Sequence, residues 1–246
     1  MFSFFKKRVS SEVDLSEIAT DMHSHLIPGI DDGSDSVERS ITLIKGLMEL
    51  GYSRIITTPH IIFDMYKNNP AIIGEGHEEL KMALSAEGIN ISTRAAAEYY
   101  MDEYFESLLE KDAPLLTIKD KMVLVEMSFS SAPLNLKEMI FHMQMKGYQP
   151  VFAHPERYLY LNANRALYDD LKDMGLLFQL NILSLAGYYG KTAGELANYL
   201  VKKGYIDLIG TDLHHVRHLA ALRSASHIMS PIKAMLDTGK ILNPLL

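Results

Sequence analysis

The 246-residue sequence contains no cysteine. Disulfide bonds, thiolate-based zinc sites and catalysis by a thiolate nucleophile are therefore excluded. A phosphatase that depends on a cysteine nucleophile is excluded for the same reason. The absence of cysteine is compatible with a cytoplasmic protein, and a cytoplasmic location is our expectation.

Long apolar runs are also missing. No stretch approaches the roughly 18 residues that a membrane-spanning helix requires. The first eight residues, MFSFFKKR, place aromatic side chains before basic ones, whereas a secretory signal has the opposite order and a longer apolar core. We expect residues 1–17 to form an N-terminal tail whose Phe side chains pack locally. A weak contact with a membrane surface is the alternative.

Positive charge is scarce. Lys and Arg number 24 against 31 Asp and Glu, which gives a net charge of -7. A nucleic-acid-binding surface would need a basic face, so we predict no nucleic-acid partner. An anionic substrate is still allowed if bound metal ions supply the positive charge. No Gly/Ser/Pro-rich linker divides the chain, and we predict a single domain over residues 18–246.

Short β-rich runs alternate with helical stretches along the chain. The predicted strands are 18–23, 54–58, 91–97, 122–125, 150–153, 176–181 and 206–211. The predicted helices are 36–50, 70–87, 102–111, 136–147, 164–175, 193–203 and 216–229. In the first helix, one apolar stripe contains Val37, Ile41, Ile44 and Met48.

Seven strand–helix units indicate a parallel sheet with helices outside it. Residues of the kinds that bind metals end six of the seven predicted strands. A barrel brings all its strand ends to one mouth, whereas an open sheet would spread them along a line. We therefore predict an α/β fold, a single-domain distorted (β/α)7 TIM-like barrel.

The pair His23 and His25 lies at the end of the first predicted strand. Residues two apart on a strand point to the same face, so both imidazoles can face one ion. With the other strand-end residues and Asp32 on the first loop, nine candidate metal ligands result: His23, His25, Asp32, His60, Glu98, Glu126, His154, Asp212 and His214. Nine are too many for one ion and suit two or three. The mixed ligands favour Mn, Fe or Zn.

Two arginines are candidates for phosphate binding. Arg157 lies three residues beyond His154, and Arg217 lies three beyond His214. Guanidinium groups bind phosphate in a bidentate manner. Three divalent ions carry about +6 and the four ligand carboxylates about -4, so the occupied site would be roughly +2 and would attract an anion. Metal-assisted phosphoester hydrolysis needs no protein nucleophile. The candidate catalytic residues are Arg157, Arg217 and Asp32.

Several segments resemble one known family. They are Asp21-Met22-His23-Ser24-His25, Ile30-Asp31-Asp32-Gly33, Thr57-Thr58-Pro59-His60, Ala97-Glu98, Val125-Glu126, His154-Pro155-Glu156-Arg157-Tyr158 and Gly210-Thr211-Asp212-Leu213-His214. Over about residues 19–220 the chain resembles the polymerase-and-histidinol-phosphatase (PHP) superfamily. Within it, the chain is most similar to the bacterial manganese-dependent tyrosine-protein phosphatases of capsule and exopolysaccharide gene clusters.

The resemblance implies a distorted barrel with three metal positions. The first would take His23, His25, Glu98 and Asp212, the second Glu98, Glu126 and His154, and the third Asp32, His60 and His214. It also implies that Arg157 binds phosphate, and that the substrate is the tyrosine-rich tail of a membrane-associated tyrosine autokinase. One departure affects Arg217, because the family's second arginine lies farther along the chain.

Two other functions stay open. The chain could be a small-molecule phosphatase, such as a histidinol phosphatase, because nothing in the ligand spacing distinguishes phosphotyrosine from another phosphomonoester. It could also be a non-catalytic binding module that keeps metals for structure. The full ligand set at an open barrel mouth favours an enzyme over this last alternative.

Overall fold

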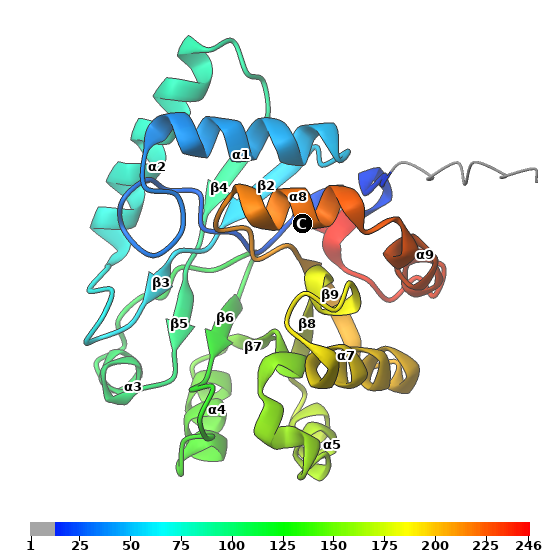
Figure 1. Cartoon of the computed structure of the whole chain (residues 1–246). Coiled ribbons are helices and arrows are strands. Elements are labelled where there is room, and N and C mark those ends of the chain that lie inside the picture. Colours follow the sequence, from blue (N-terminus) through cyan, green and yellow to red (C-terminus); the bar gives the residue numbers. More distant parts are fainter. Residues whose placement is uncertain (1–12) are drawn as a thin grey trace, which may run out of the picture.

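A computed structural model describes residues 13–246 (Figure 1). The strands are β1 (Thr20–Asp21), β2 (Arg54–Thr57), β3 (His60–Ile61), β4 (Ser92–Ala95), β5 (Glu98–Tyr100), β6 (Met122–Glu126), β7 (Gln149–Ala153), β8 (Leu177–Asn181) and β9 (Ile206–Gly210). The helices are α1 (Val37–Glu49), α2 (Pro70–Ala86), α3 (Glu103–Glu110), α4 (Leu136–Met145), α5 (Ala166–Asp173), α6 (Ile182–Leu185), α7 (Lys191–Lys203), α8 (Val216–Ser224) and α9 (Met229–Leu236). Most of the N-terminal tail, including its Phe residues, lies outside the described residues.

All strand pairings are parallel, and they form two sheets. One has the order β1-β2-β4 and the other the order β3-β5-β6-β7-β8-β9. The chain just after β1 joins the two sheets: the backbone N–H of His25 donates to Leu213 beyond β9, and the N–H of Thr58 donates to Ser24. The predicted parallel α/β barrel is confirmed as a distorted barrel, with helices α3, α4, α5 and α7 outside the longer sheet (Figure 1).

Two predicted strands are each broken in the structure. The run 54–58 ends at Thr57 and resumes as β3 at His60, and the run 91–97 ends at Ala95 and resumes as β5 at Glu98. Both jogs lie side by side, because Thr57 pairs with Ala95 and His60 with Glu98. Pro59 lies in the first jog and has no N–H to donate to a ladder. The second break shows that the prediction for Glu98 was wrong: Glu98 does not end a strand but begins β5.

The first predicted strand was too long. Its regular part is limited to β1, and a 3-10 turn, Ser16–Ile18, precedes it. Ala19, between the turn and the strand, has a φ of 63°. A residue with a positive φ breaks the extended backbone, so the regular strand begins at Thr20.

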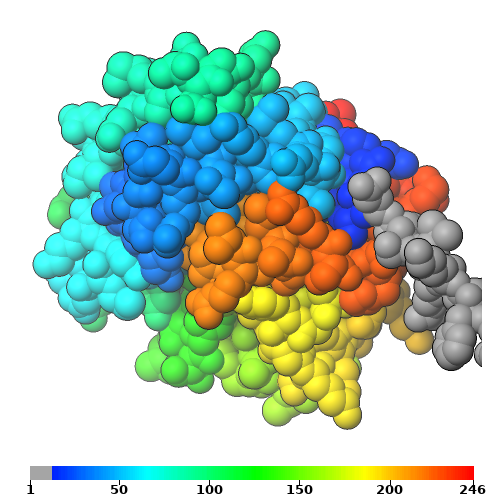
Figure 2. Space-filling model, turned by 45° about the horizontal axis from the view of Figure 1, so that its top comes forward, coloured from blue at the N-terminus to red at the C-terminus, as the bar shows by residue number. Residues whose placement is uncertain are grey.

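Helix α1 has the predicted limits but a different buried face. The Ser36 side chain accepts from the N–H of Arg39 at its start, as an N-cap does. Met48, predicted for the apolar stripe, is exposed. The buried face contains Ser40, Leu43, Ile44, Gly46 and Leu47. A Cβ at Gly46 would overlap the side chain of Leu219 in α8, so α1 turns toward that helix. Figure 2 shows α8 (orange) between α1 (blue) and residues of the α6–α7 region (yellow).

The last predicted helix, 216–229, is two helices. Helix α8 ends at Ser224, a 3-10 turn follows, and α9 begins at Met229. Pro231 explains the restart, because proline is tolerated only in the first turn of a helix. Helix α6 was not predicted. It begins directly after β8, where the Asn181 side chain accepts from the N–H of Leu183.

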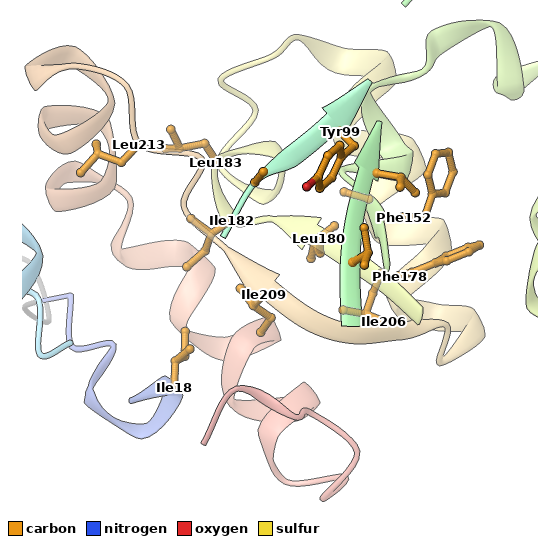
Figure 3. Close-up of a cluster of buried hydrophobic side chains, with 14 of the residues drawn as sticks. Ile18, Tyr99, Phe152, Phe178, Leu180, Ile182, Leu183, Ile206, Ile209 and Leu213 are labelled. Carbon is orange, nitrogen blue, oxygen red and sulfur yellow. The ribbon is translucent and has the colours of Figure 1, made fainter. Parts of the chain in front are cut away.

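Two buried apolar clusters hold the barrel together. The larger one lies between the strands and the surrounding elements and includes Tyr99, Phe152, Phe178, Leu180 and Ile209 (Figure 3). The smaller one draws residues from β2, β6, β7 and β9, among others, and so fills the inside of the barrel. The barrel is thus a packed core rather than a pore, and its functional residues lie at the mouth. No helix within residues 13–246 is long and apolar enough to cross a membrane.

Candidate metal centre

All nine predicted ligands meet at the mouth of the barrel. They form four overlapping groups, and within each group the candidate ligand atoms lie within 4.8 Å of one another. The groups are His25, Asp32, His60 and His214; His23, His154 and Asp212; His23, His25 and Glu98; and His60, Glu98 and Glu126. Every residue predicted as a ligand belongs to at least one group.

The backbone around His23 and His25 explains why both side chains face the same centre. Ser24, between them, forms a parallel bridge with Leu213, so this stretch continues the strand geometry beyond β1. The two imidazoles therefore lie on one face, with their Nε2 atoms 3.4 Å apart. The prediction that the pair would point to one face is confirmed.

Two other ligands have a strained backbone. His154 has a φ of 33° and Asp212 a φ of 51°, both in the left-handed region. Such a conformation is uncommon for residues other than glycine and costs on the order of 1–3 kcal/mol. His154 directly follows β7, and Asp212 lies two residues beyond the end of β9. Both side chains belong to the ligand cluster. Backbone strain of this kind is typical of functional sites.

Glu98 lies at the centre of the cluster and is fully buried. One carboxylate oxygen, Oε2, is 3.1 Å from His23 Nε2 and 3.2 Å from His60 Nδ1. The other, Oε1, is 3.0 Å from His154 Nε2. Burial alone would raise the pKa of Glu98, but the His23 and His60 imidazoles outweigh it and hold this pKa well below its usual range. A buried carboxylate with both oxygens facing imidazoles is suited to bridge two cations.

The arrangement of His60 shows that this donor set fits metal ions. Among residues 13–246, its buried Nδ1 has no hydrogen-bond partner although it lies 2.9 Å from Glu126 Oε1, as expected of two groups that would bind one ion. Burial and His25 lower the pKa of His60, but Glu98 and Glu126 outweigh them and raise it to about 9. A proton on His60 would thus hold this imidazole beside the carboxylates at a position that a divalent ion would take.

Asp31 supports the centre and was not predicted to do so. Its Oδ2 lies 2.7 Å from His25 Nδ1 and accepts from the backbone N–H of His60. Its Oδ1 accepts from the N–H of Gly33. A carboxylate behind a ligating imidazole fixes the ring and raises its basicity. The sequence shows Asp31 and Asp32 side by side, but it carries no signal for which of them faces the ions.

Strand β8 ends without a predicted ligand, yet it supplies two supporting amides. Gln179 Oε1 lies 2.8 Å from His23 Nδ1, which leaves His23 Nε2 free to face the carboxylates. Asn181 Nδ2 donates to Asp212 Oδ2 over 3.0 Å. Sequence reasoning missed both residues, because a Gln or Asn near a strand end carries no metal-type signal.

Asp32, His60 and His214 form the solvent-facing edge of the cluster. Asp32 Oδ1 is 3.5 Å from His60 Nε2 and 3.4 Å from His214 Nε2. The Asp32 side chain is 52% exposed, whereas the His25 ring is buried and stacks on His214 with centroids 4.0 Å apart. This edge is therefore the part of the cluster that solvent reaches.

The structure places the two predicted arginines differently. Arg157 Nη1 donates to Asp212 Oδ2 over 2.6 Å, and the Arg157 side chain is only 22% exposed. Its guanidinium carbon lies 4.8 Å from the ring centroid of Phe129 and 4.3 Å from that of Tyr189. Arg217, in contrast, is exposed on the first turn of α8 and forms no ion pair within residues 13–246. Arg157 joins the cluster, and Arg217 does not.

Comparison with known families gives one match over most of the chain. The family described as capsular polysaccharide synthesis, CpsB/CapC, matches residues 19–230. This span includes all nine candidate ligands and both arginines.

Individual relatives agree with the family match. The tyrosine-protein phosphatase YwqE of Bacillus subtilis is 33% identical over 198 residues, covering 80% of this chain and 78% of its own. The tyrosine-protein phosphatase CpsB of Streptococcus pneumoniae is 27% identical over 202 residues, covering 80% and 83%. A crystal structure from a study of these two proteins, described as unique metal-dependent tyrosine phosphatases, superposes with a TM-score of 0.78, 30% identity and 86% coverage of both chains.

Proposed function

Because the chain belongs to the CpsB/CapC family of capsular polysaccharide synthesis proteins, we propose that it is a metal-dependent tyrosine-protein phosphatase, a phosphoric monoester hydrolase. The observation that carries this function is the convergence of five imidazoles and four carboxylates at the barrel mouth, beside the guanidinium of Arg157. The cluster provides metal sites, and the arginine provides a fixed positive group for phosphate.

We propose two to three divalent ions, with Mn as the expected metal and Fe or Zn as alternatives. The first position has the densest support. Nε2 of His23 lies 3.1 Å from Glu98 and 3.4 Å from Asp212, and Nε2 of His25 lies 3.4 Å from each of the same carboxylates. Four ligand atoms around one point are a typical coordination set for such an ion.

The other two positions share residues with the first or lie beside it. Glu98, Glu126 and His154 would hold the second ion, since His154 Nε2 lies 3.0 Å from Glu98 Oε1 and 3.9 Å from Glu126 Oε2. Asp32, His60 and His214 would hold the third, at the exposed edge. Divalent ions held by these residues would supply activated water near neutral pH and would stabilise charge on the phosphoryl oxygens.

Arg157 is suited to orient the phosphate. A guanidinium carries five N–H donors, so one can remain on Asp212 while others turn to phosphoryl oxygens. The rings of Phe129 and Tyr189 fix its plane. We propose that Arg217 makes a second phosphate contact, for which its exposed side chain must turn toward the mouth.

Asp32 acts in the proposal as a metal ligand at the entrance. Its partial burial raises its pKa, but His214 and His60 outweigh this effect and hold it below its usual range. A carboxylate that stays ionised at neutral pH is a poor proton donor. The tyrosine oxygen can leave without a proton from Asp32, because phenolate is already a fair leaving group.

The alternative of a small-molecule phosphatase such as histidinol phosphatase is less well supported. The curated relatives are named tyrosine-protein phosphatases. The non-catalytic alternative has no support in the site, which holds a full ligand set with an exposed edge.

The remaining parts of the proposal rest on the family resemblance. We propose that the substrate is the tyrosine-rich tail of a membrane-associated tyrosine autokinase that controls capsular or exopolysaccharide synthesis. We further propose that the enzyme acts in the cytoplasm, where such a tail would lie. A single phosphatase domain over residues 18–246 is part of the same proposal.

A comparison of two substrates tests this function. The full-length protein, loaded with Mn²⁺, is assayed with a phosphotyrosine peptide and with histidinol phosphate. We expect kcat/KM to be much higher for the peptide. A much higher kcat/KM for histidinol phosphate would show that the substrate is a small molecule, and metal content without turnover of any phosphoester would favour a binding module.

A further inference from the structure

A groove of about 510 Å³ is lined by segments that follow three ligand-bearing strands. Its walls come from the loop after β3, the start of α3 after β5, and the loop between β6 and α4 (Figure 1). These segments come after His60, Glu98 and Glu126 in the chain. Because parallel strands end at the same side of the barrel, the groove lies on the side that carries the metal centre.

Hydrogen bonds connect the walls of the groove to one another. Asp102 joins two of its walls: Oδ1 accepts from the N–H of Phe105 and so caps α3, while Oδ2 accepts from the N–H of Phe63 in the loop after β3. Asn135 joins the third wall by donating to the carboxylate of Glu106 over 3.1 Å. These side-chain hydrogen bonds connect the three walls of the groove.

The floor and rim of the groove are apolar. Met101 and Met139 are buried in its floor, whereas Phe63 is 53% exposed and Leu134 is fully exposed at its rim. Exposed apolar side chains around a concave surface are typical of protein-binding sites. Aromatic and Met side chains are enriched at such contacts.

The charged residues that line the groove are all acidic. Four carboxylates line it, from Asp64, Asp102, Glu103 and Glu106, and no Lys or Arg does. None of the four forms an ion pair within residues 13–246. Asp64 and Glu103 are exposed, and their side chains have no hydrogen-bond partner in that range, so both are available to a ligand.

We propose that this groove binds the part of the substrate chain that flanks the phosphotyrosine, and that it selects segments with an apolar side chain and a Lys or Arg near that residue. The inference rests on the proposed phosphatase function and adds a sequence preference to it. Met101 lies three residues from Glu98, about 10 Å along an extended chain. Glu103 follows Met101 by two residues, and we place the preferred basic residue about three positions from the phosphotyrosine.

Matched peptides test the preference. The full-length Mn²⁺-loaded protein is assayed with phosphotyrosine peptides that carry Lys, Gln or Glu three positions before or after the phosphotyrosine. An exposed ion pair changes affinity by roughly 1.4- to 5-fold. With two available carboxylates, we expect kcat/KM for the better Lys peptide to exceed that of its Glu counterpart on the order of 10-fold. The ratio should shrink in high salt.

Variants locate the preference in the groove. The double variant Asp64→Asn with Glu103→Gln should reduce the Lys-to-Glu ratio to about 2-fold or less. Glu38→Gln is the matched control, because Glu38 is also an acidic residue in the first turn of a helix and does not line the groove. The control should keep the wild-type ratio. Phe63→Ala should raise KM for peptides that carry an apolar flanking residue.

Failure of the groove proposal and failure of the phosphatase function give different results in these assays. Equal kcat/KM for the Lys and Glu peptides, or a ratio that survives the double variant, would overturn the groove proposal while leaving the phosphatase function intact. If free phosphotyrosine and every peptide are left unhydrolysed, the proposed function itself fails. If the groove holds a second copy of this chain, sedimentation would show a dimer and the charge preference would be absent, which also overturns the proposal.

Discussion

Replacement of Arg157 tests how the site binds phosphate. Arg157→Ala removes a guanidinium that is mostly buried, lies 2.6 Å from Asp212 and is held between two aromatic rings. A hydrogen bond to a charged group contributes about 1.5–3 kcal/mol, which corresponds to about a 10- to 150-fold change in rate. Loss of one donor to a developing oxyanion costs about 100- to 1000-fold. We therefore expect kcat/KM to fall about 100-fold.

The conservative variant separates charge from shape. Arg157→Lys keeps the positive charge but loses the planar fork that binds two oxygens and stacks between the rings. We expect an intermediate loss, about 10-fold. Arg217→Ala should cost less than Arg157→Ala, because the exposed Arg217 side chain must give up conformational freedom to reach a phosphate.

The assay must separate phosphate binding from metal binding. Arg157 contributes to the low pKa of Asp212, together with His23 and His214 and against the effect of burial. Loss of Arg157 would therefore change the charge beside a predicted metal ligand, so metal content must be measured for each variant. Steady-state hydrolysis of a phosphotyrosine peptide is measured at pH 8 with the bound metal quantified for each variant. If Arg157→Ala with full metal content stays within 2-fold of wild type, Arg157 does not bind the phosphate.

Three further substitutions probe the support of the centre. Asp31→Asn removes the carboxylate behind His25 and should weaken metal affinity about 10- to 100-fold by competition with a chelating dye; unchanged affinity would exclude this support. Gly33→Ala would place a Cβ against the His25 carbonyl and should lower the free energy of unfolding in urea by about 1–3 kcal/mol. Wild-type stability would show that the loop can move to accommodate the Cβ. Burial raises the pKa of Glu156 from 4.5 to about 7, so its ionisation should cost the metal-free protein on the order of 3 kcal/mol as pH rises through that window. Glu156→Gln should flatten this part of the stability profile, and an unchanged profile would show that Glu156 is not responsible.

Much of the fold follows from the sequence because its strands end in chemically distinctive residues. Strands β6, β7 and β9 lie within two residues of their predicted limits. The jogs between β2 and β3 and between β4 and β5 could not be predicted, because each depends on its neighbour across the sheet. The buried face of α1 was misplaced for a similar reason: its contact with Leu219 in α8 comes from a distant part of the chain.

The ligand set was predictable, whereas its supports were not. His, Asp and Glu at strand ends carry a metal-type signal, and all nine such residues meet in one cluster. Asp31, Gln179 and Asn181 act through hydrogen bonds to those ligands. Their roles depend on which ring nitrogen or carboxylate oxygen they face, and residue type alone does not encode that.

Metal content measured together with turnover tests the central claim most directly. Elemental analysis of the purified full-length protein is combined with a phosphotyrosine-peptide assay before and after chelation, and again after Mn²⁺ is restored. The nine-ligand cluster predicts two to three ions per chain, loss of turnover with the metal, and recovery with Mn²⁺. Full turnover by protein that holds less than one ion per chain would contradict the account.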